Sequence, residues 1–557
     1  MTKHKQPLDT QPDKHYDVVV IGSGFGGSIA ANRLAGAGLN VLVLERGPWR
    51  DSLPVRGMGI ADRSPFPYGA RFATHVLRSI TVGRGSTPGV VHGRHGRRLR
   101  ARGVELARRL VGTPRRGVVV NRRGMYEVFS YPGIDVVCVS GVGGGSHGWL
   151  GLLVEPSDSA YWESRHPDLR AGQISGYYEK IRSDLGATRM TRQHAVPTSV
   201  WRELPGLAGQ RCQPADPQPD AAYLYPKSGT DAGRLHQDGA GAPRRFCAFD
   251  GDSLLGSRDG AKSSVDIAYL APVLDKGVTV RALSEVSQIV REPGAAAGGY
   301  VVHYRDLRGK TNHTARAPRV VLAAGTMNTL RLLFEGQQRD DLAAMPSLGA
   351  TFGGNGDEIG VCFKNPADPP TLPAPPVLGR FTVDEAPSPF YGLASASGLD
   401  TLPLPRWVRR RLHRLMFAFG MGADSGKASA HFERGRVEID YDKTTEPIFD
   451  RIAEGLAAFE TDTGLRASRL RKPLTVHAWG GACLGPDPGH GVVDHRGEIY
   501  GNPGLFVADA AALPAAVGTP PSLAIAAWAH HVADRLADTI ARHPNLTAVE
   551  PSTEGAH

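Results

Sequence analysis

Several features that define large protein classes are missing from this sequence of 557 residues. Its five cysteines, Cys138, Cys212, Cys247, Cys362 and Cys483, include no CxxC pair. An odd, scattered set argues against both a disulfide framework and a structural zinc site, so we expect no metal. No stretch reaches the roughly 18 to 20 uninterrupted apolar residues that a transmembrane helix requires.

Signals for export and for nucleic-acid binding are also missing. The first residues, MTKHKQPLDTQPDKH, contain no apolar segment, which argues against a secretory signal and favours a cytoplasmic location. The net charge is +10, and arginines crowd residues 94–123 and 406–414, but no zinc-finger pattern or aromatic-interleaved groove accompanies them. These clusters fit either a solvated surface or attraction to an anionic substrate, carrier protein or membrane surface.

Glycine, by contrast, is abundant, with 69 residues. Residues 17–21 contain a continuous β-branched run with no polar face, which predicts a buried parallel strand. Gly22, Gly24 and Gly27 follow at once with the G-x-G-x-x-G spacing. This spacing permits a tight turn, close approach of backbone to a pyrophosphate, and close packing of the next helix, so it indicates a dinucleotide-binding fold.

The elements after this turn agree with that interpretation. A helix is predicted over 28–37, and its N-terminus offers N–H groups and a positive dipole end to phosphates. A second hydrophobic strand, 40–44, ends in Glu45, at the spacing where a carboxylate accepts the hydroxyls of an adenosine ribose. Glu45 fits either NAD or FAD and argues against the phosphate of NADP.

A second glycine-rich stretch lies at 135–156, DVVCVSGVGGGSHGWLGLLVEP. An apolar strand runs into Gly141, Gly143, Gly144 and Gly145. Such a turn presents several backbone N–H groups and lets an extended ligand lie directly on the main chain. We therefore expect a second ligand-binding loop here.

The patterns between these anchors predict further elements. We expect a helix over 161–185 and antiparallel strands over 278–291 and 299–305. Between Leu404 and Phe419, apolar residues recur at helical spacing opposite arginines. That pattern predicts a packed surface helix, with a substrate lid or membrane-resting element as the alternative.

The C-terminal part supplies the third anchor. A parallel strand is predicted over 319–324, and another over 505–508 that ends in Asp509 and leads, through a proline-rich loop, into a helix over 523–537. His477 stands shortly before a glycine pair. An acid at a strand end beside a helix N-terminus is a second place for cofactor contacts.

Three stretches together resemble the glucose–methanol–choline (GMC) oxidoreductases, and within them the cholesterol oxidase branch. They are GSGFGG with Glu45, GVGGGSHGWLGLLVEP, and VHAWGGACLG with GLFVADAAALPAAVGTPPSLAIAAWA. The segment RRFCAFDGDSLLGSRDGAKSSVDIAYLAP is similar to a cysteine-rich stretch of steroid-oxidase-like members, of which only Cys247 is present. The resemblance implies FAD as the cofactor.

The resemblance also implies an α/β fold. An FAD-binding Rossmann-like domain, with a doubly wound parallel sheet of the glutathione-reductase type, is interrupted by a mixed-sheet α+β substrate domain. The expected FAD-binding segments are 1–60, 125–190, 245–345 and 470–545. The other expected segments are a cofactor-covering excursion at 61–124, the substrate domain at 191–244 and 346–469, and a tail at 546–557.

Carried over position by position, the resemblance implies a set of cofactor contacts. The first glycine loop and Glu45 hold the ADP half, the second glycine turn follows the pyrophosphate and ribityl chain, and Asp509 lies near the isoalloxazine. The implied cofactor-binding residues are Gly22, Ser23, Gly24, Phe25, Gly26, Gly27, Glu45, Arg46, Gly141, Gly144, Gly145, Ser146, Trp149, Val286, Ala324, Gly325, Asp509, Ala510, Pro520 and Pro521.

For catalysis, His477 matches the family's active-site histidine. A neutral imidazole there accepts the alcohol proton as hydride leaves carbon for the flavin. Asp384 or Glu385, in FTVDEAPSP, matches the second acid/base of the cholesterol oxidase branch, with a solvated turn acid as the alternative.

The sequence departs from the family pattern at the last loop, where Pro520 stands in place of an Asn or His that pairs with the histidine at the substrate oxygen. Proline offers no side-chain donor or acceptor. Trp149 likewise replaces an Asn, and His147 replaces an apolar residue. Thr519, His147 or an altered reaction would have to compensate.

These observations favour an FAD-dependent oxidoreductase acting on a secondary alcohol of a bulky apolar substrate, sterol-like or polyketide-derived, with oxygen or another electron acceptor. One alternative is a tailoring enzyme of secondary metabolism that performs desaturation, isomerisation or rearrangement. An alternative of another class is a catalytically silent flavin-fold binding protein. We expect no nucleic-acid partner and no integral membrane segment, with peripheral membrane contact left open.

Overall fold

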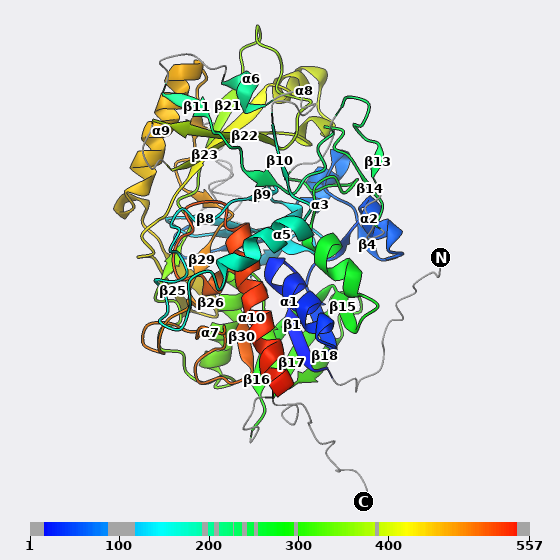
Figure 1. Cartoon of the computed structure of the whole chain (residues 1–557), viewed down its shortest axis with the longest axis vertical. Helices are drawn as coiled ribbons and strands as arrows, with labels where there is room; N and C mark the ends of the chain where they lie inside the picture. The colour runs from blue at the N-terminus through cyan, green and yellow to red at the C-terminus, as the bar shows by residue number, and fades with distance from the viewer. Residues whose placement is uncertain are drawn as a thin grey trace, which may run out of the picture.

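The computed structural model describes residues 16–86, 117–191, 199–204, 211–226, 228–236, 242–249, 254–293, 299–384 and 389–542. Figure 1 shows two regions stacked along the long axis of the molecule. One is a parallel sheet covered by helices, and the other is an antiparallel sheet flanked by a long helix. The predicted α/β class with a second, mixed-sheet region is confirmed.

The parallel sheet has the strand order β15-β2-β1-β19-β30. Its strands are β1 (Val18–Ile21), β2 (Val41–Glu45), β15 (Val278–Ala282), β19 (Arg319–Leu322) and β30 (Leu505–Val507). β1 is fully buried, as expected for a continuous β-branched strand covered on both faces. The sheet collects strands from three distant parts of the chain, so this region is discontinuous in sequence; the exact domain boundaries stay a prediction.

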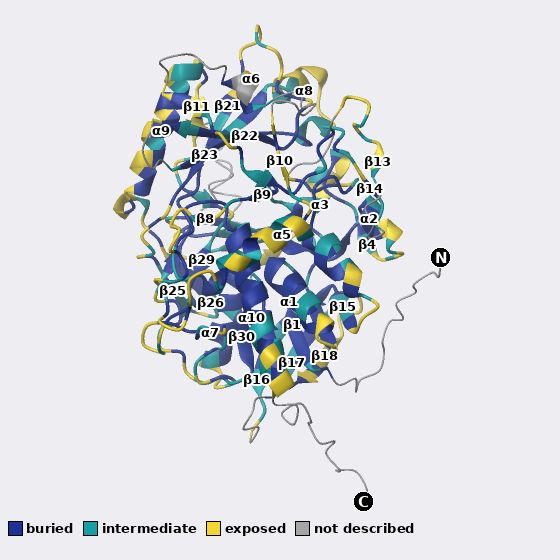
Figure 2. Ribbon diagram, in the orientation of Figure 1, coloured by how far each residue is buried: buried dark blue, intermediate teal, exposed yellow. Residues whose placement is uncertain are grey.

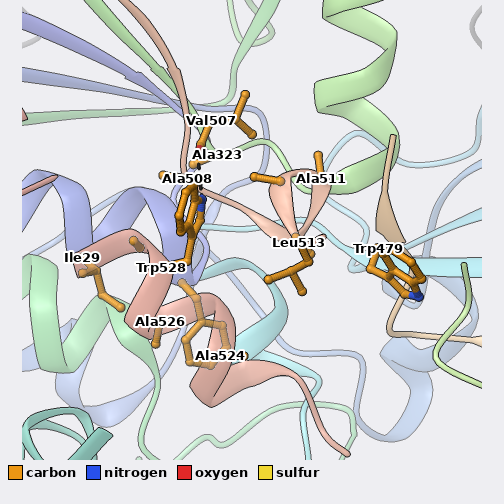
Figure 3. Packing of buried hydrophobic residues seen from close by; sticks show 14 of the residues in the cluster. Ile29, Ala323, Trp479, Val507, Ala508, Ala511, Leu513, Ala524, Ala526 and Trp528 are labelled. Atoms are coloured by element: carbon orange, nitrogen blue, oxygen red, sulfur yellow. Dashed lines mark hydrogen bonds between the residues drawn. The ribbon is translucent and has the colours of Figure 1, made fainter. Parts of the chain in front are cut away.

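Three helices accompany this sheet: α1 (Phe25–Gly36), α7 (Thr326–Gln338) and α10 (Ser522–Arg542). Figure 3 shows Trp528 of α10 beside Ile29 of α1 and Ala508, the residue after β30. Trp528 is completely buried, and its Nε1 donates to the Val507 carbonyl at 2.9 Å. This indole therefore fastens the C-terminal helix to the sheet while its only polar atom stays satisfied.

An antiparallel sheet of β16 (Ser284–Arg291), β17 (Tyr300–Asp306) and β18 (Asn312–Ala317) follows β15. The expected pairing of the strands around 284–291 and 299–305 is confirmed. The expectation of one strand over 278–291 is wrong, because Leu283 has a φ of +57° and separates β15 from β16. β15 consequently pairs with β2 in the parallel sheet.

The second region is built on a six-stranded sheet with the order β11-β22-β23-β24-β21-β27. Its strands are β11 (Cys212–Pro214), β21 (Glu358–Phe363), β22 (Val377–Val383), β23 (Phe390–Ser395), β24 (Leu415–Met421) and β27 (Ser468–Arg469). Helix α9 (Ile448–Thr463) packs against it through an apolar stripe and leaves its other face exposed (Figure 2).

A five-stranded sheet, β28-β8-β7-β5-β6, contains the strand that leads into the second glycine turn. Its strands are β5 (Leu77–Val82), β6 (Val118–Val119), β7 (Tyr126–Ser130), β8 (Asp135–Val139) and β28 (Leu474–Thr475). The shorter strands are β3 (Trp49–Arg50), β4 (Arg63–Ser64), β9 (Leu152–Leu153), β10 (Thr188–Arg189), β12 (Asp220–Ala221), β13 (Leu235–His236), β14 (Arg244–Arg245), β20 (Phe352–Gly353), β25 (Ser429–Glu433), β26 (Arg436–Asp440) and β29 (Trp479–Gly480). The shorter helices are α2 (Leu53–Gly57), α3 (Phe72–His75), α5 (Tyr178–Asp184), α6 (Val200–Glu203) and α8 (Arg406–Leu412).

Two predicted helices are wrong over most of their length. The helix expected over 161–185 is reduced to α5, because Pro167 and the glycines at 172 and 176 interrupt the apolar pattern. The helix expected over 404–419 ends at Leu412, and residues 415–421 form β24 instead. α8 buries none of its residues, and Trp407 is 72% exposed, so it is not the packed surface helix that its spacing predicts.

None of the helices that the structure describes is long and apolar enough to cross a bilayer. Most of the arginines at 94–123, together with the tail at 546–557, lie outside the described residues.

A pair of histidines in α10 gives the stability of this fold a pH dependence. His530 and His531 are completely buried, and His530 is stacked on Tyr177 with 5.2 Å between ring centroids. Burial lowers the pKa of both imidazoles to about 4 from the ordinary value of 6.5. Since the unfolded chain binds these protons first, their contribution to stability is complete above about pH 6.5 and is lost as the pH falls towards 4.

We predict that His530→Phe becomes progressively more stable relative to the wild type as the pH is lowered from 7 to 4.5. The difference in unfolding free energy should grow by about 1.4 kcal/mol per pH unit below about pH 6.5, measured by denaturant unfolding. Burial also raises the pKa of Asp424 and of Asp509 to about 6, and these two carboxyl groups stabilise the fold as the pH falls. The comparison with the wild type is therefore needed, because it cancels their contribution. A difference that stays constant with pH would contradict the prediction.

Candidate FAD site and active site

The candidate cofactor site lies at the carboxyl edge of the parallel sheet. β1, β19 and β30 are neighbours in the sheet and run in the same direction, so the loops that follow them meet at one edge. These loops contain Gly22, the pair Ala324–Gly325, and Asp509. All three were expected to contact a cofactor, and the sheet order explains how they converge.

The first glycine loop is held by backbone contacts that no side chain would permit. A Cβ on Gly22, which has a φ of +96°, would lie 2.2 Å from the Ala323 carbonyl oxygen. A Cβ on Gly26 would lie 2.2 Å from the Ala508 oxygen, and one on Gly27 would lie 2.0 Å from the Gly22 oxygen. The loop therefore touches the ends of β19 and β30 directly, and α1 starts immediately above the sheet edge.

The N-terminus of α1 is open for an anion. No side chain caps it, and its first turn contains no acidic residue. The first N–H groups of a helix have no partner within the helix, and they carry the positive end of its dipole. This combination suits the diphosphate of a dinucleotide.

Glu45, at the end of β2, is tied to the same loop. Its Oε2 accepts hydrogen bonds from the Ser23 backbone N–H at 3.1 Å and the Ser23 hydroxyl at 2.8 Å, and its Oε1 accepts from Gly47 N–H at 2.7 Å. Arg46 instead forms an ion pair with Glu127 and contacts Asn328 at the start of α7. A role for Glu45 at a ribose stays a prediction.

The second glycine loop lies against the first. A Cβ on Gly144, which has a φ of +51°, would lie 2.6 Å from the Gly24 Cα. Ser146, fully buried, donates to the Gly143 carbonyl at 2.7 Å and accepts from Val265 N–H at 3.1 Å. Gly145, by contrast, is exposed, and a Cβ there would meet nothing within 4 Å.

Asp509 completes this edge. Its Oδ2 accepts from Gly325 N–H at 2.8 Å and the Thr329 hydroxyl at 2.6 Å, and its Oδ1 accepts from Ala511 N–H at 2.9 Å. Burial raises its pKa to about 6. Asp509 thus joins the start of α7 to the end of β30, beside Gly325, whose α-carbon also faces open space.

The residues present fit a flavin dinucleotide. Backbone at Gly145 and Gly325 borders open space at the sheet edge, and the N-terminus of α1 is uncapped. Nearby, the indole Nε1 of Trp149 is buried and has no hydrogen-bond partner among the described residues. Trp149 packs edge to face on Phe25, the first residue of α1, with 4.9 Å between ring centroids. An extended ligand with phosphate and carbonyl oxygens would satisfy such donors.

His477 lies in the loop between β28 and β29. Its Nδ1 is 2.9 Å from Oδ1 of Asp357, whose side chain is buried, whereas the histidine side chain is 20% exposed. The other carboxylate oxygen of Asp357 accepts from the Thr475 hydroxyl at 2.8 Å and from Val476 N–H at 3.1 Å. Because a carboxylate accepts, Nδ1 carries the proton, and a neutral imidazole has its lone pair on Nε2.

Two more residues fix the surroundings of this pair. Asp424 accepts from Gly354 N–H at 2.6 Å and from the Trp479 Nε1 at 3.0 Å, and burial raises its pKa to about 6. Asn355 accepts from Gly518 N–H at 2.8 Å and donates to the Thr519 carbonyl at 2.9 Å. Asn355 and Asp357 were not singled out from the sequence; the only local signal was the polar run NGDE before an apolar strand.

Among the described residues, none of the other expected catalytic residues has a hydrogen bond to His477. Asp384 directly follows β22, is 53% exposed and forms a bidentate ion pair with Arg211, which lowers its pKa through hydrogen bonding. The geometry therefore fits the alternative of a solvated turn acid and disfavours a second acid/base. Glu385 lies outside the described residues.

His147 and Thr519 are also occupied by structural contacts. His147 is 3% exposed, its Nε2 donates to the Val142 carbonyl at 2.5 Å, and burial lowers its pKa. The Thr519 hydroxyl donates to the Glu155 carbonyl at 2.8 Å. The first bond lies within the second glycine loop, and the second joins the loop before α10 to the segment after β9. Neither residue therefore compensates in an evident way for Pro520, which is buried with Pro521 before α10.

Val286 and Ala510 are the remaining expected cofactor contacts. Val286 is buried in β16, next to a bulge in its pairing with β17, and its carbonyl accepts from Arg331 at 3.4 Å. Ala510 follows Asp509 and is also buried. Contacts of either residue with a cofactor stay a prediction.

One basic residue near the second glycine loop was missed. Lys262 is 1% exposed, and its Nζ donates to the carbonyls of His147 at 2.8 Å and Trp149 at 2.9 Å. It therefore holds the end of that loop in place. The sequence signal was the GAK tripeptide in the stretch that carries the family resemblance.

Comparisons with known proteins agree with this site. Family models described as GMC oxidoreductase match residues 227–337 and 427–529, and one described as FAD binding domain matches residues 17–60. A cholesterol oxidase of Mycobacterium tuberculosis is 25% identical over 94% of this chain and 91% of its own length. A cholesterol oxidase of Acinetobacter baumannii is 23% identical over 92% of this chain and 93% of its own.

Among solved structures, pyridoxine 4-oxidase from Mesorbium loti aligns with a TM-score of 0.55 and 17% identity, covering 93% of this chain and 99% of that one. At this identity the likeness shows the fold alone. Together, the family models and the relatives support FAD as the cofactor that fits the carboxyl edge of the sheet.

We predict that alanine at Gly144 and at Gly145 has different consequences. Gly144→Ala forces a Cβ against Gly24 and should lower the unfolding midpoint of the protein freed of FAD. Gly145→Ala should leave that midpoint unchanged but weaken FAD binding, because its Cβ enters the space beside the loop. Thermal unfolding of the FAD-free protein and FAD titration measure the two effects separately. Unchanged FAD affinity in Gly145→Ala would remove Gly145 from the cofactor site.

Proposed function

Because the chain belongs to the GMC oxidoreductases and is an FAD-dependent alcohol oxidoreductase, we propose that it oxidises a secondary alcohol on a bulky apolar substrate, with His477 as the base. The observation that carries this proposal is the hydrogen bond between His477 Nδ1 and Asp357. It fixes the tautomer that leaves Nε2 free to accept a proton.

The residues around His477 support this role. Asp357 is itself oriented by Thr475 and by the Val476 N–H, so the carboxylate cannot turn away from the imidazole. When Nε2 takes the hydroxyl proton of the alcohol, the imidazolium is stabilised by the carboxylate on its other side. FAD, when bound, supplies the acceptor for the hydride that leaves the carbon. The proton and the hydride would thus go to different acceptors, His477 and the cofactor.

An apolar substrate is favoured by a cluster of buried apolar side chains in the region next to His477. A cluster separate from the main core lies between the six-stranded sheet and the short strands β9 and β12. Its buried members are Leu152, Met190, Ala221, Tyr223, Tyr225, Val377, Phe390, Ala394, Phe419 and Met421. The Met421 sulfur is 3.9 Å from Nδ2 of Asn355, two residues before Asp357, so the cluster reaches the neighbourhood of the proposed base.

The two cholesterol oxidases among the relatives support a sterol-like alcohol and oxygen as the electron acceptor, and a polyketide-derived alcohol is the alternative. Oxygen or another acceptor then reoxidises the enzyme.

One observation favours a second candidate function. Pro520 supplies no polar side chain to the substrate oxygen, and the neighbouring Thr519 hydroxyl is already used by Glu155. Loss of a second donor commonly costs about two to three orders of magnitude in such a step. A desaturation, isomerisation or rearrangement needs no such donor at an alcohol oxygen. Anaerobic addition of sterols and polycyclic alcohols, followed by product analysis, separates these reactions. Isomerisation or rearrangement leaves the flavin oxidised, whereas alcohol oxidation and desaturation both bleach the flavin absorption and differ in whether a carbonyl or a new C=C bond is formed.

We predict that His477→Ala lowers the rate of anaerobic flavin reduction by the alcohol about 10² to 10⁴-fold, because the proton then has no acceptor. Stopped-flow absorbance measures this rate. The FAD content per chain should remain that of the wild type, since His477 makes no contact with the glycine loops. Reduction at the wild-type rate would exclude the base role.

We further predict that Asp357→Asn lowers the same rate about 10 to 10³-fold. The neutral amide no longer stabilises the imidazolium or enforces the proton on Nδ1. Glu358→Gln is the matched control, because this neighbouring buried carboxylate pairs with Lys443 at 2.7 Å and not with His477. An equal loss of rate in both variants would contradict the assignment.

A further inference from the structure

Three side chains with metal-binding chemistry meet away from the cofactor edge. They are His166, which is buried, His495, which is partly exposed, and Asp168, whose side chain is 65% exposed. One ligand atom from each lies within 4.8 Å of the other two. We propose that His166, Asp168 and His495 form a binding site for a divalent transition-metal ion such as zinc. This inference is independent of the proposed oxidation of an alcohol.

The spacing of the cluster is close to what a zinc ion requires. Zinc bonds to histidine nitrogen and carboxylate oxygen are about 2.0 to 2.2 Å long, so neighbouring ligands in a tetrahedron are about 3.3 to 3.6 Å apart. Oδ2 of Asp168 lies 3.6 Å from Nδ1 of His495 and 3.9 Å from Nδ1 of His166. Metal binding would require side-chain rotation that shortens the longer of these separations.

The protonation of the imidazoles suits a metal. The backbone N–H of Asp168 donates to Nδ1 of His166 at 3.1 Å, so this nitrogen is unprotonated, and a metal ion bound there would replace that hydrogen bond at its lone pair. The two rings are 5.1 Å apart, and two charged imidazoles at that distance would repel each other.

The surrounding groups favour a cation. Asp494 is buried beside His495 and accepts from Arg496 at 3.0 Å. The negative charges of Asp494 and Asp168 both favour positive charge at His166. His531 donates from Nε2 to the His495 carbonyl at 2.7 Å, which fixes the backbone that presents the ligand. The exposed side of Asp168 leaves a position for water, so the arrangement is two imidazoles, one carboxylate and one solvent molecule.

The site would have a structural effect. His166 and Asp168 belong to the irregular segment before α5, whereas His495 lies in the turn before β30. A shared ion would link the irregular segment before α5 to the turn that leads into β30 of the parallel sheet. A ligand that binds only the folded chain raises its stability, so metal should raise the unfolding midpoint.

The test uses the FAD-loaded full chain, treated with a chelator and transferred to metal-free buffer. Calorimetric titration with Zn²⁺ gives affinity and stoichiometry, and titration with Co²⁺ reports tetrahedral coordination through visible bands to the red of the flavin absorption. The ligand variants are His495→Ala and Asp168→Asn, both at positions with some exposure. His490→Ala is the control, because His490 is an exposed histidine 2.9 Å from Asp487 and outside the cluster.

We expect one ion per chain in the wild type and in His490→Ala, and at least about tenfold weaker binding in both ligand variants. Zn²⁺ should raise the unfolding midpoint by about 2 °C at a hundredfold excess over the dissociation constant in the first two proteins only. Binding of equal strength in all four proteins would place the ion at other histidines and overturn the proposal. Absence of binding in the wild type would overturn it as well, and would leave the cluster as a set of hydrogen-bonded side chains.

Discussion

The close approach of backbone to backbone at the carboxyl edge of the parallel sheet is the constraint on which the rest of the structure depends. Gly22 and Gly26 touch the ends of β19 and β30, and Gly24 touches Gly144 in the second glycine loop. Each contact has room for hydrogen and for nothing larger. Because β1, β19 and β30 start far apart in the chain, these contacts bring together segments that sequence separates. The uncapped end of α1, the exposed Gly145 and the carboxylate of Asp509 then share one edge.

Sequence patterns predict this edge well because their cause is local. A β-branched run predicts β1, and the glycine spacing predicts the turn. Glu45, expected at a ribose, hydrogen-bonds Ser23 and Gly47 in the structure, and its contact with a ribose stays a prediction. In each case the residue and its structural reason are neighbours in the chain, so one sequence suffices.

Elements whose shape depends on distant partners were less predictable. The apolar spacing of residues 404–419 fits a helix, yet Leu415 begins β24, because pairing with β21 and β23 gives that segment ladder partners on both sides. The partner of His477 is similarly hidden. Asp357 is far away in sequence and looks like a turn acid, whereas Asp384, in a more suggestive motif, is taken by Arg211. The cluster of His166, Asp168 and His495 could not be predicted for the same reason. Sequence rules for metal sites recognise ligands at short, fixed spacings, and His495 is far from the other two in the chain.

The histidine and its carboxylate reach each other from different sheets. Asp357 immediately precedes β21 of the six-stranded sheet, and His477 lies between β28, which pairs with β8, and β29, which pairs with β20. Asp424 holds the same junction by accepting from Gly354 and Trp479. The orientation of the imidazole therefore depends on how the six-stranded sheet is seated. If the base and its carboxylate lay on one strand, the tautomer would not depend on the position of the six-stranded sheet. Here the lone pair on Nε2 is correctly placed only when that sheet packs correctly against the loop that contains His477.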